Sequence, residues 1–234
     1  MKKLSFLIVL LSINVSANSI LIKSGQINDG LGNSFIGDIL IVDEKIVEVG
    51  KFLNSSSAKI IEARGKPVTP GLISPISNIG VVEINALDVT NDDSPDFFGP
   101  GFSVFNAFNP HSTLIPWNRS NGVTSSISTP GYSSQIFKGM GSFYLLDGDI
   151  DITGNADVAM YSRLGAVGGS RAETIQIMES MFELALNKDE LELEELLGTT
   201  FASSMDMQLQ DIQALSRVVN REIPLVMEVN RAID

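Results

Sequence analysis

The spacing of the apolar runs changes at Pro70-Gly71, and this change divides the chain into two kinds of structure. Before it, short runs rich in Ile and Val are separated by Asn, Gly, Asp and Ser. Runs of this kind are typical of strands in a small antiparallel sheet. They occupy residues 20–23, 37–42, 45–50 and 59–62. The pair Asp43-Glu44, between two of these runs, predicts a tight hairpin.

After Pro70 the elements lie further apart and helical patterns enter. Residues 171–187 carry apolar side chains at i, i+3, i+7 and i+10, the spacing of one helix face. These side chains are Ile175, Met178, Phe182 and Ala185. A second helix is marked by Leu209, Ile212, Leu215 and Val219, and Pro116 opens a short one.

Four strands are expected among these helices, at residues 123–129, 142–146, 158–161 and 223–229. Strands and helices then alternate, which predicts an α/β fold with parallel strands. The glycines of Gly139-Met140-Gly141 and of residues 165–169 are interpreted as turns.

The N-terminus has the pattern of a secretory signal peptide. Lys2 and Lys3 precede an apolar run at residues 4–15, which ends in Val15-Ser16-Ala17. The run is about a dozen residues long, and a membrane span needs roughly 20. We expect cleavage after Ala17 and a periplasmic or secreted protein without a stable membrane span. An uncleaved anchor is the alternative.

The composition excludes several kinds of chemistry. Without Lys2 and Lys3 the chain keeps 14 basic residues against 28 acidic ones, a net charge near −14. Nucleic acid is therefore not expected as a partner. The absence of cysteine excludes disulfides, thiolate nucleophiles and cysteine-based zinc sites. The single histidine, His111, is too few for a metal site built on several imidazoles.

Three polar features are weak candidates for sites. Asp147-Gly148-Asp149-Ile150-Asp151 resembles a calcium loop, but the position that should hold a bidentate Glu is Met160, so a polar turn is the alternative. His111 could act as a general acid or base, or be an ordinary loop histidine. The acidic run at residues 189–195 is typical of a solvated helix face.

Two segments carry a family resemblance. Residues 37–50, and then 61–73 with the motif Pro70-Gly71-Leu72-Ile73, resemble the opening of the amidohydrolase superfamily, in particular its imidazolonepropionase-related branch. Asn109-Pro110, residues 119–124 and Pro130-Gly131 follow in the order usual for that branch. The resemblance implies a small β-sandwich at residues 18–70, after the signal peptide at 1–17. It also implies the first part of a TIM-like (β/α) barrel at residues 71–234.

The resemblance also implies where a metal would bind. Family members carry Asp-x-His-x-His after the equivalent of Ile73, and alternation along the strand lets the two imidazoles bind one ion. This chain has Ser74, Ile76 and Asn78 there. Ile76 has no ligand atom, and Asn78 offers a neutral carbonyl oxygen that suits a hard cation.

A second ligand position follows Pro224, where family members often have a histidine, then an Arg and an Asp. Here the histidine is replaced by Glu228, and Arg231 and Asp234 are present. Asn78 and Glu228 are therefore the candidate metal ligands, as positional equivalents, and catalytic residues are unknown. The alternative for Glu228 is a structural carboxylate that pairs with a nearby Arg or Lys.

The resemblance implies a function for a longer protein. A complete barrel takes about 250 residues, and about 160 follow Pro70, so we expect a fragment whose open strand edges pair with the rest of the barrel or with a second copy. The parent would use one divalent metal ion to activate water and hydrolyse a non-peptide C–N bond of a small cyclic amide or amide. The fragment alone would be inactive. The alternative is a non-catalytic periplasmic binding or scaffold protein, a pseudoenzyme.

Overall fold

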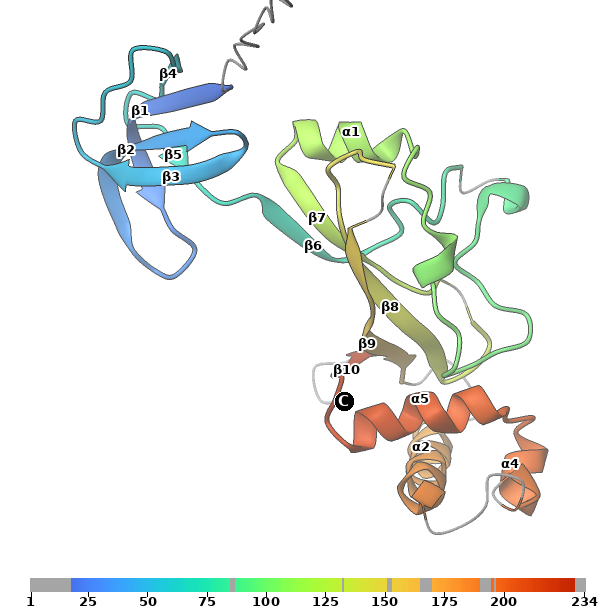
Figure 1. Cartoon of the computed structure of the whole chain (residues 1–234). Coiled ribbons are helices and arrows are strands. Elements are labelled where there is room, and N and C mark those ends of the chain that lie inside the picture. Colours follow the sequence, from blue (N-terminus) through green and yellow to red (C-terminus); the bar gives the residue numbers. More distant parts are fainter. Residues whose placement is uncertain are drawn as a thin grey trace, which may run out of the picture. The chain divides into compact units, whose positions relative to one another are not determined.

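The computed structural model describes residues 18–84, 87–131, 133–150, 153–164, 170–189, 195 and 197–229. The chain divides into two compact units, Met1–Pro70 and Gly71–Asp234 (Figure 1). Some predicted features lie outside the described residues: the signal peptide at 1–17 with its cleavage site after Ala17, Asp151, the glycines at 165–169, most of the acidic run at 189–195, Arg231 and Asp234.

The first unit is a five-stranded sheet. Its strands are β1 (Ser19–Asn28), β2 (Ser34–Val42), β3 (Lys45–Gly50), β4 (Lys59–Glu62) and β5 (Pro67–Val68). The order is β3-β2-β1-β4, and β5 also pairs with β1. β1, β2 and β3 are antiparallel as predicted, but β4 and β5 run parallel to β1. The pattern of apolar runs reports which residues are strands and not the direction in which they pair.

The predicted hairpin at Asp43-Glu44 is confirmed. Val42 pairs with Lys45, so the loop has two residues. Both loop residues have positive φ, 47° for Asp43 and 66° for Glu44. This is the left-handed backbone that two-residue hairpins use to match the twist of their strands.

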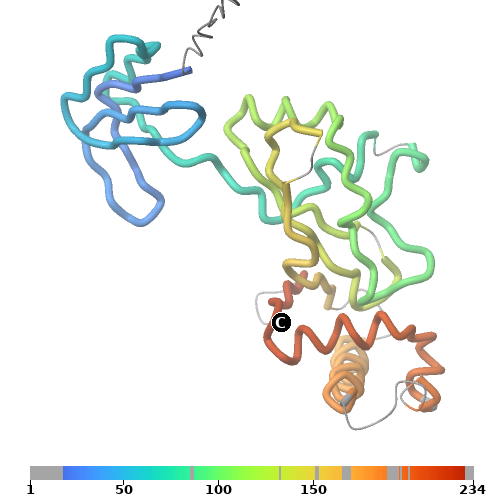
Figure 2. Tube along the Cα trace, viewed as in Figure 1, coloured from blue at the N-terminus to red at the C-terminus, as the bar shows by residue number. Residues whose placement is uncertain are grey.

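The second unit is built on another five-stranded sheet with the order β10-β9-β8-β7-β6. Its strands are β6 (Leu72–Ser77), β7 (Val123–Ser128), β8 (Phe137–Leu145), β9 (Gly154–Arg163) and β10 (Leu225–Glu228). β6 is parallel to β7, and β10 is parallel to β9. β8 is antiparallel to both of its neighbours, and Figure 2 shows β8 and β9 side by side. A parallel pair needs a connection of about a dozen residues or more, and those on either side of β8 are shorter.

The predicted turn at Gly139-Met140-Gly141 is wrong, because these residues lie inside β8. Gly139 has φ +122°, and the pairing of β8 with β9 shifts register between Phe137 and Gly139. The shift explains why Phe137 and Met140, three residues apart, both pack in the same core cluster. Regular alternation would place them on opposite faces. The glycine therefore marks a bulge within a strand.

The helices of the second unit are α1 (Leu114–Ser120), α2 (Arg171–Leu186), α4 (Thr200–Ser204) and α5 (Leu209–Val219), with 3-10 turns η1 (Asp88–Thr90), η2 (Phe105–Ala107) and η3 (Asn187–Asp189). α2 begins where the Ser170 side chain accepts a hydrogen bond from the Glu173 N–H. Its buried face is Thr174, Met178, Met181, Leu184 and Ala185. Ile175, predicted on that face, is 45% exposed.

The main core lies between the sheet and two helices. Side chains of α2 and α5 pack against Phe137, Met140 and Met160 of β8 and β9, and Figure 1 shows the two helices lying together beside this end of the sheet. A second cluster surrounds Tyr144 and includes Ile115 of α1. Among the described residues, no helix combines the length and apolar character needed to cross a membrane.

Candidate functional site

One end of the second sheet, where four of its strands terminate, is where the resemblance places a metal. β6, β7, β9 and β10 end here, and β8 begins here because it runs the opposite way. In (β/α) barrels the corresponding end, at the C-termini of the strands, carries the active site. The residues at this end of the sheet include Asn78, Lys138, Arg163 and Glu228.

The end of β6 offers few ligand atoms. Ile76 is 62% exposed and has no polar group in its side chain. Asn78 is exposed, and its backbone carbonyl accepts hydrogen bonds from the N–H groups of Val81 and Val82 at 3.1 and 3.0 Å. The register with β7 also shifts between Ser74 and Ser77. Simple alternation therefore does not hold along the part of β6 where two ligands would have to share a face.

A group of buried serines joins β6 to β7. The hydroxyl of Ser77 lies 3.0 Å from that of Ser126, which lies 3.4 Å from the hydroxyl of Ser128. Ser128 donates to the Ile79 carbonyl at 2.6 Å. Ser126 and Ser128 are fully buried, so these hydrogen bonds satisfy groups that would otherwise be costly to bury. The alternating serines of β7 could have indicated this ladder from the sequence. Its role is structural.

The end of β10 carries an ionic cluster of Glu228 with Lys138 and Arg163, called here the Glu228 cluster. Lys138 Nζ lies 3.3 Å from Glu228 Oε2. Arg163 donates through Nε to Oε2 and through Nη2 to Oε1, both at 3.4 Å. The side chains are 17%, 27% and 48% exposed for Lys138, Arg163 and Glu228. This agrees with the alternative interpretation of Glu228, a structural carboxylate that pairs with a nearby Arg or Lys. Neither partner was predicted from the sequence, because they lie 90 and 65 residues away.

The cluster changes the acidity of Glu228. The hydrogen bond from Arg163 lowers the pKa of the carboxyl from its ordinary value of 4.5, and Lys138 lowers the pKa further by a hydrogen bond and by its charge. Partial burial opposes the two cations and raises the pKa, but its effect is smaller than that of Arg163. Glu228 is therefore held in its ionised form.

We expect the stabilising effect of Glu228 to fade at acid pH. Its pKa is lower in the folded chain, so the stabilisation is complete above the unfolded pKa of about 4.3 and is lost as the pH falls through the folded value. The contribution is small, about 0–1 kcal/mol, because the carboxylate is half exposed. Thermal melts of wild type and Glu228→Gln should differ most at about pH 6–7, and the difference should shrink as the pH falls below the unfolded pKa of about 4.3. A difference that does not shrink at acid pH would contradict this assignment.

The two candidate metal ligands lie on opposite edge strands of the sheet. Asn78 follows β6 and Glu228 ends β10, with β7, β8 and β9 between them. Within the described parts of the chain, no three His, Cys, Asp or Glu side chains form a group that could hold a metal ion. The side chains at these positions do not fit the metal that the family resemblance implies.

The other polar features have structural roles where they are described. Arg119 donates to the backbone carbonyls of Leu146, at 3.0 Å, and Asp147, and so fixes the turn after β8. The Asp147 carboxylate accepts from the Asp149 N–H at 3.0 Å. His111 is exposed beside Arg119 in an open hollow of about 290 Å³.

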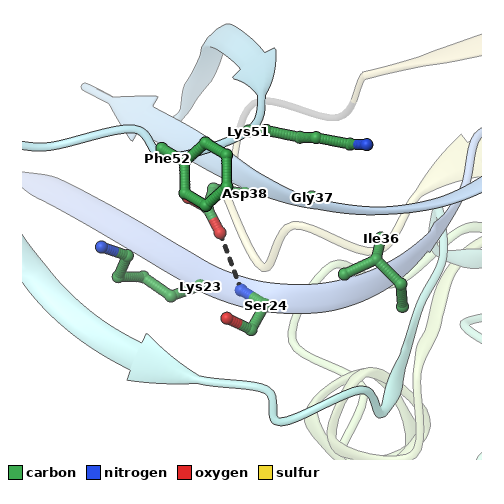
Figure 3. A pocket seen from close by; sticks show the side chains of 7 residues that line it. All are labelled: Lys23, Ser24, Ile36, Gly37, Asp38, Lys51 and Phe52. Atoms are coloured by element: carbon green, nitrogen blue, oxygen red, sulfur yellow. Dashed lines mark hydrogen bonds between the residues drawn. The ribbon is translucent and has the colours of Figure 1, made fainter.

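The first unit contains a separate pocket of about 330 Å³, flanked by Lys23 and Lys51 (Figure 3). Asp38 also lines this pocket and is 5% exposed. Its carboxylate accepts hydrogen bonds from the N–H groups of Ser24, at 2.7 Å, and Leu53, at 3.0 Å. Ser24 has positive φ at the bulge of β1, so Asp38 fixes an irregular stretch of backbone. This explains its burial without a ligand.

Comparisons with known proteins agree with this architecture. No protein-family model matches the sequence. The crystal structure of an amidohydrolase from Thermotoga maritima MSB8 superposes with a TM-score of 0.69 at 24% identity, over 92% of this chain and 59% of that one. This likeness confirms the predicted fold class, a small β-sandwich module followed by an incomplete TIM-like (β/α) barrel.

Two curated proteins match a shorter stretch. A 5-methylthioadenosine/S-adenosylhomocysteine deaminase from Thermococcus onnurineus is 46% identical over 57 residues, and a dihydroorotase from Lactococcus lactis is 45% identical over 56. Each match covers 24% of this chain and 13% of the relative. The fold is thus similar to that of an amidohydrolase, and a stretch of 56–57 residues is similar to a deaminase and a dihydroorotase. The imidazolonepropionase-related branch stays a prediction.

Proposed function

We propose that this chain is the N-terminal part of an exported amidohydrolase-type protein, and that the whole protein hydrolyses a non-peptide C–N bond of a small cyclic amide or amide. The observation that carries the proposal is the β module followed by a half-barrel, which matches an amidohydrolase over 92% of this chain. The two local sequence relatives, a deaminase and a dihydroorotase, are C–N hydrolases by name.

We propose in addition that the 234-residue chain alone is inactive. Ile76 cannot bind a metal, and Glu228 is already bound by Lys138 and Arg163. The described residues therefore supply a scaffold and one side of a barrel mouth. The groups that act on the substrate would come from later strands, which would pair with the open edges of β6 and β10.

The test compares this chain with the product of the longest reading frame that contains it, both purified without chelators. We expect the longer protein to hydrolyse at least one member of a panel of cyclic amides and amides, including dihydroorotate, and to contain a divalent metal. We expect the 234-residue chain to show neither. Activity in the short chain would contradict the second proposal. Mass spectrometry of the same proteins tests export, because cleavage after Ala17 leaves a chain that begins at Asn18.

A non-catalytic binding or scaffold protein is the second candidate. It is favoured by one specific observation: the three positions aligned with metal-binding histidines hold an exposed isoleucine, an exposed asparagine and an ion-paired glutamate. A longer product that folds, lacks metal and turns over nothing in the panel would support this candidate over the first.

A further inference from the structure

We propose that Lys138 and Arg163 form a binding site for one carboxylate group at the barrel mouth, and that the chain's own Glu228 fills this site. The ligand class is a small carboxylate, free or as the acidic group of a larger molecule. The proposal rests on the geometry of the Glu228 cluster and holds whether or not the whole protein is an enzyme.

The donors are arranged as a carboxylate requires. Three nitrogen atoms converge on two oxygens: Lys138 Nζ and Arg163 Nε on Oε2, and Arg163 Nη2 on Oε1. The planar guanidinium presents two parallel N–H groups, the arrangement that binds a carboxylate at both oxygens. The ammonium group of Lys138 adds a second positive charge. The site would therefore recognise a planar anion with two oxygens.

The two cations lie on central strands of the sheet, and the carboxylate lies on an edge strand. Lys138 and Arg163 come from β8 and β9, which have neighbours on both sides, whereas β10 is an edge strand. Lys138 follows the buried Phe137 and precedes the bulge at Gly139. Glu228 is also the most exposed member of the cluster. The site should thus remain when the Glu228 side chain is replaced.

The charge balance favours an anion over a metal. Two cations face a single carboxylate, so the cluster carries a net charge of +1 within a chain of net charge −12. A divalent cation at Glu228 would have to displace both or lie beside them, at a large electrostatic cost. Removing the Glu228 carboxylate instead leaves two cations, only 17% and 27% exposed, without their anion. A carboxylate from solution can take its place.

The test is a calorimetric titration of the 234-residue chain with acetate at constant ionic strength. Glu228→Ala and Glu228→Gln should both bind acetate more tightly than wild type, by up to roughly fivefold, because the tethered carboxylate no longer competes for the site. Acetamide, which has the same shape without the charge, should not bind. Circular dichroism establishes that each variant is folded, and Glu228→Gln decides the result if the smaller side chain prevents folding.

Two controls separate the site from general charge effects. Arg163→Met in the Glu228→Gln background should abolish acetate binding, and Arg221→Met, at an exposed arginine of the same unit, should leave it unchanged. Equal acetate affinity in wild type and both Glu228 variants would overturn the proposal, as would the absence of binding in all of them. Zinc binding by wild type that Glu228→Gln abolishes would also overturn it, because Glu228 would then be a metal ligand.

Discussion

We expect Tyr144→Ala to lower the free energy of unfolding of the second unit by about 3–5 kcal/mol, the range for removing a large aromatic side chain from a core. Tyr144 is completely buried in β8. Its ring stacks on Phe108, with centroids 3.9 Å apart, and on Phe105 at 6.0 Å. Its hydroxyl donates to the Phe105 carbonyl at 2.9 Å. Urea denaturation followed by circular dichroism measures the loss.

Tyr144→Phe is the matched control, because it keeps the ring and removes only the hydroxyl. Burial raises the pKa of Tyr144 to about 12, so the group is a neutral hydrogen-bond donor throughout the usual pH range. Losing such a hydrogen bond costs about 0.5–1.5 kcal/mol. If Tyr144→Ala costs no more than Tyr144→Phe, the stacked ring does not stabilise this core, and the assignment of Tyr144 as its centre is wrong.

The sequence predicted the local elements better than their arrangement. The hairpin at Asp43-Glu44 and the amphipathic helix at residues 171–187 follow from patterns within a few residues, and both are present. The direction of β8 and the parallel pairing of β4 depend on strand order. The face of α2 that is buried depends on what packs against it, and this explains the exposure of Ile175. Local periodicity carries little information about strand direction or about which helix face is buried.

The candidate site shows the same limit. The sequence placed Ile76, Asn78 and Glu228 at positions where relatives bind metal. All three lie at the same end of the sheet, although on different strands. It could not show that Lys138 and Arg163 would surround Glu228, because that contact requires β8, β9 and β10 to be neighbours in this order. The Asp and Arg expected after Glu228 lie outside the described residues. A resemblance between sequences identifies aligned positions, and the fold decides which side chains meet there.

The second large effect is expected at Gly139, the bulge that precedes Met140 in β8. Its φ of +122° is open to glycine and strained for other residues, and a Cβ atom there would lie 2.7 Å from the backbone oxygen of Phe102. Backbone strain costs about 1–3 kcal/mol, and so does overpacking. We therefore expect Gly139→Ala to lower the free energy of unfolding by roughly 2–6 kcal/mol in urea denaturation.

Gly122→Ala separates the two causes. Gly122 also has positive φ, +90°, but a Cβ atom there would meet nothing within 4 Å. Its substitution should therefore cost only the strain, about 1–3 kcal/mol. The difference between the two variants measures the contact with Phe102, whose carbonyl accepts the Met140 N–H at 2.7 Å. Because Lys138 immediately precedes the bulge, a shift of the backbone there should also loosen its ion pair with Glu228. Equal losses for the two alanine variants would show that the close approach of Phe102 does not require a glycine in β8.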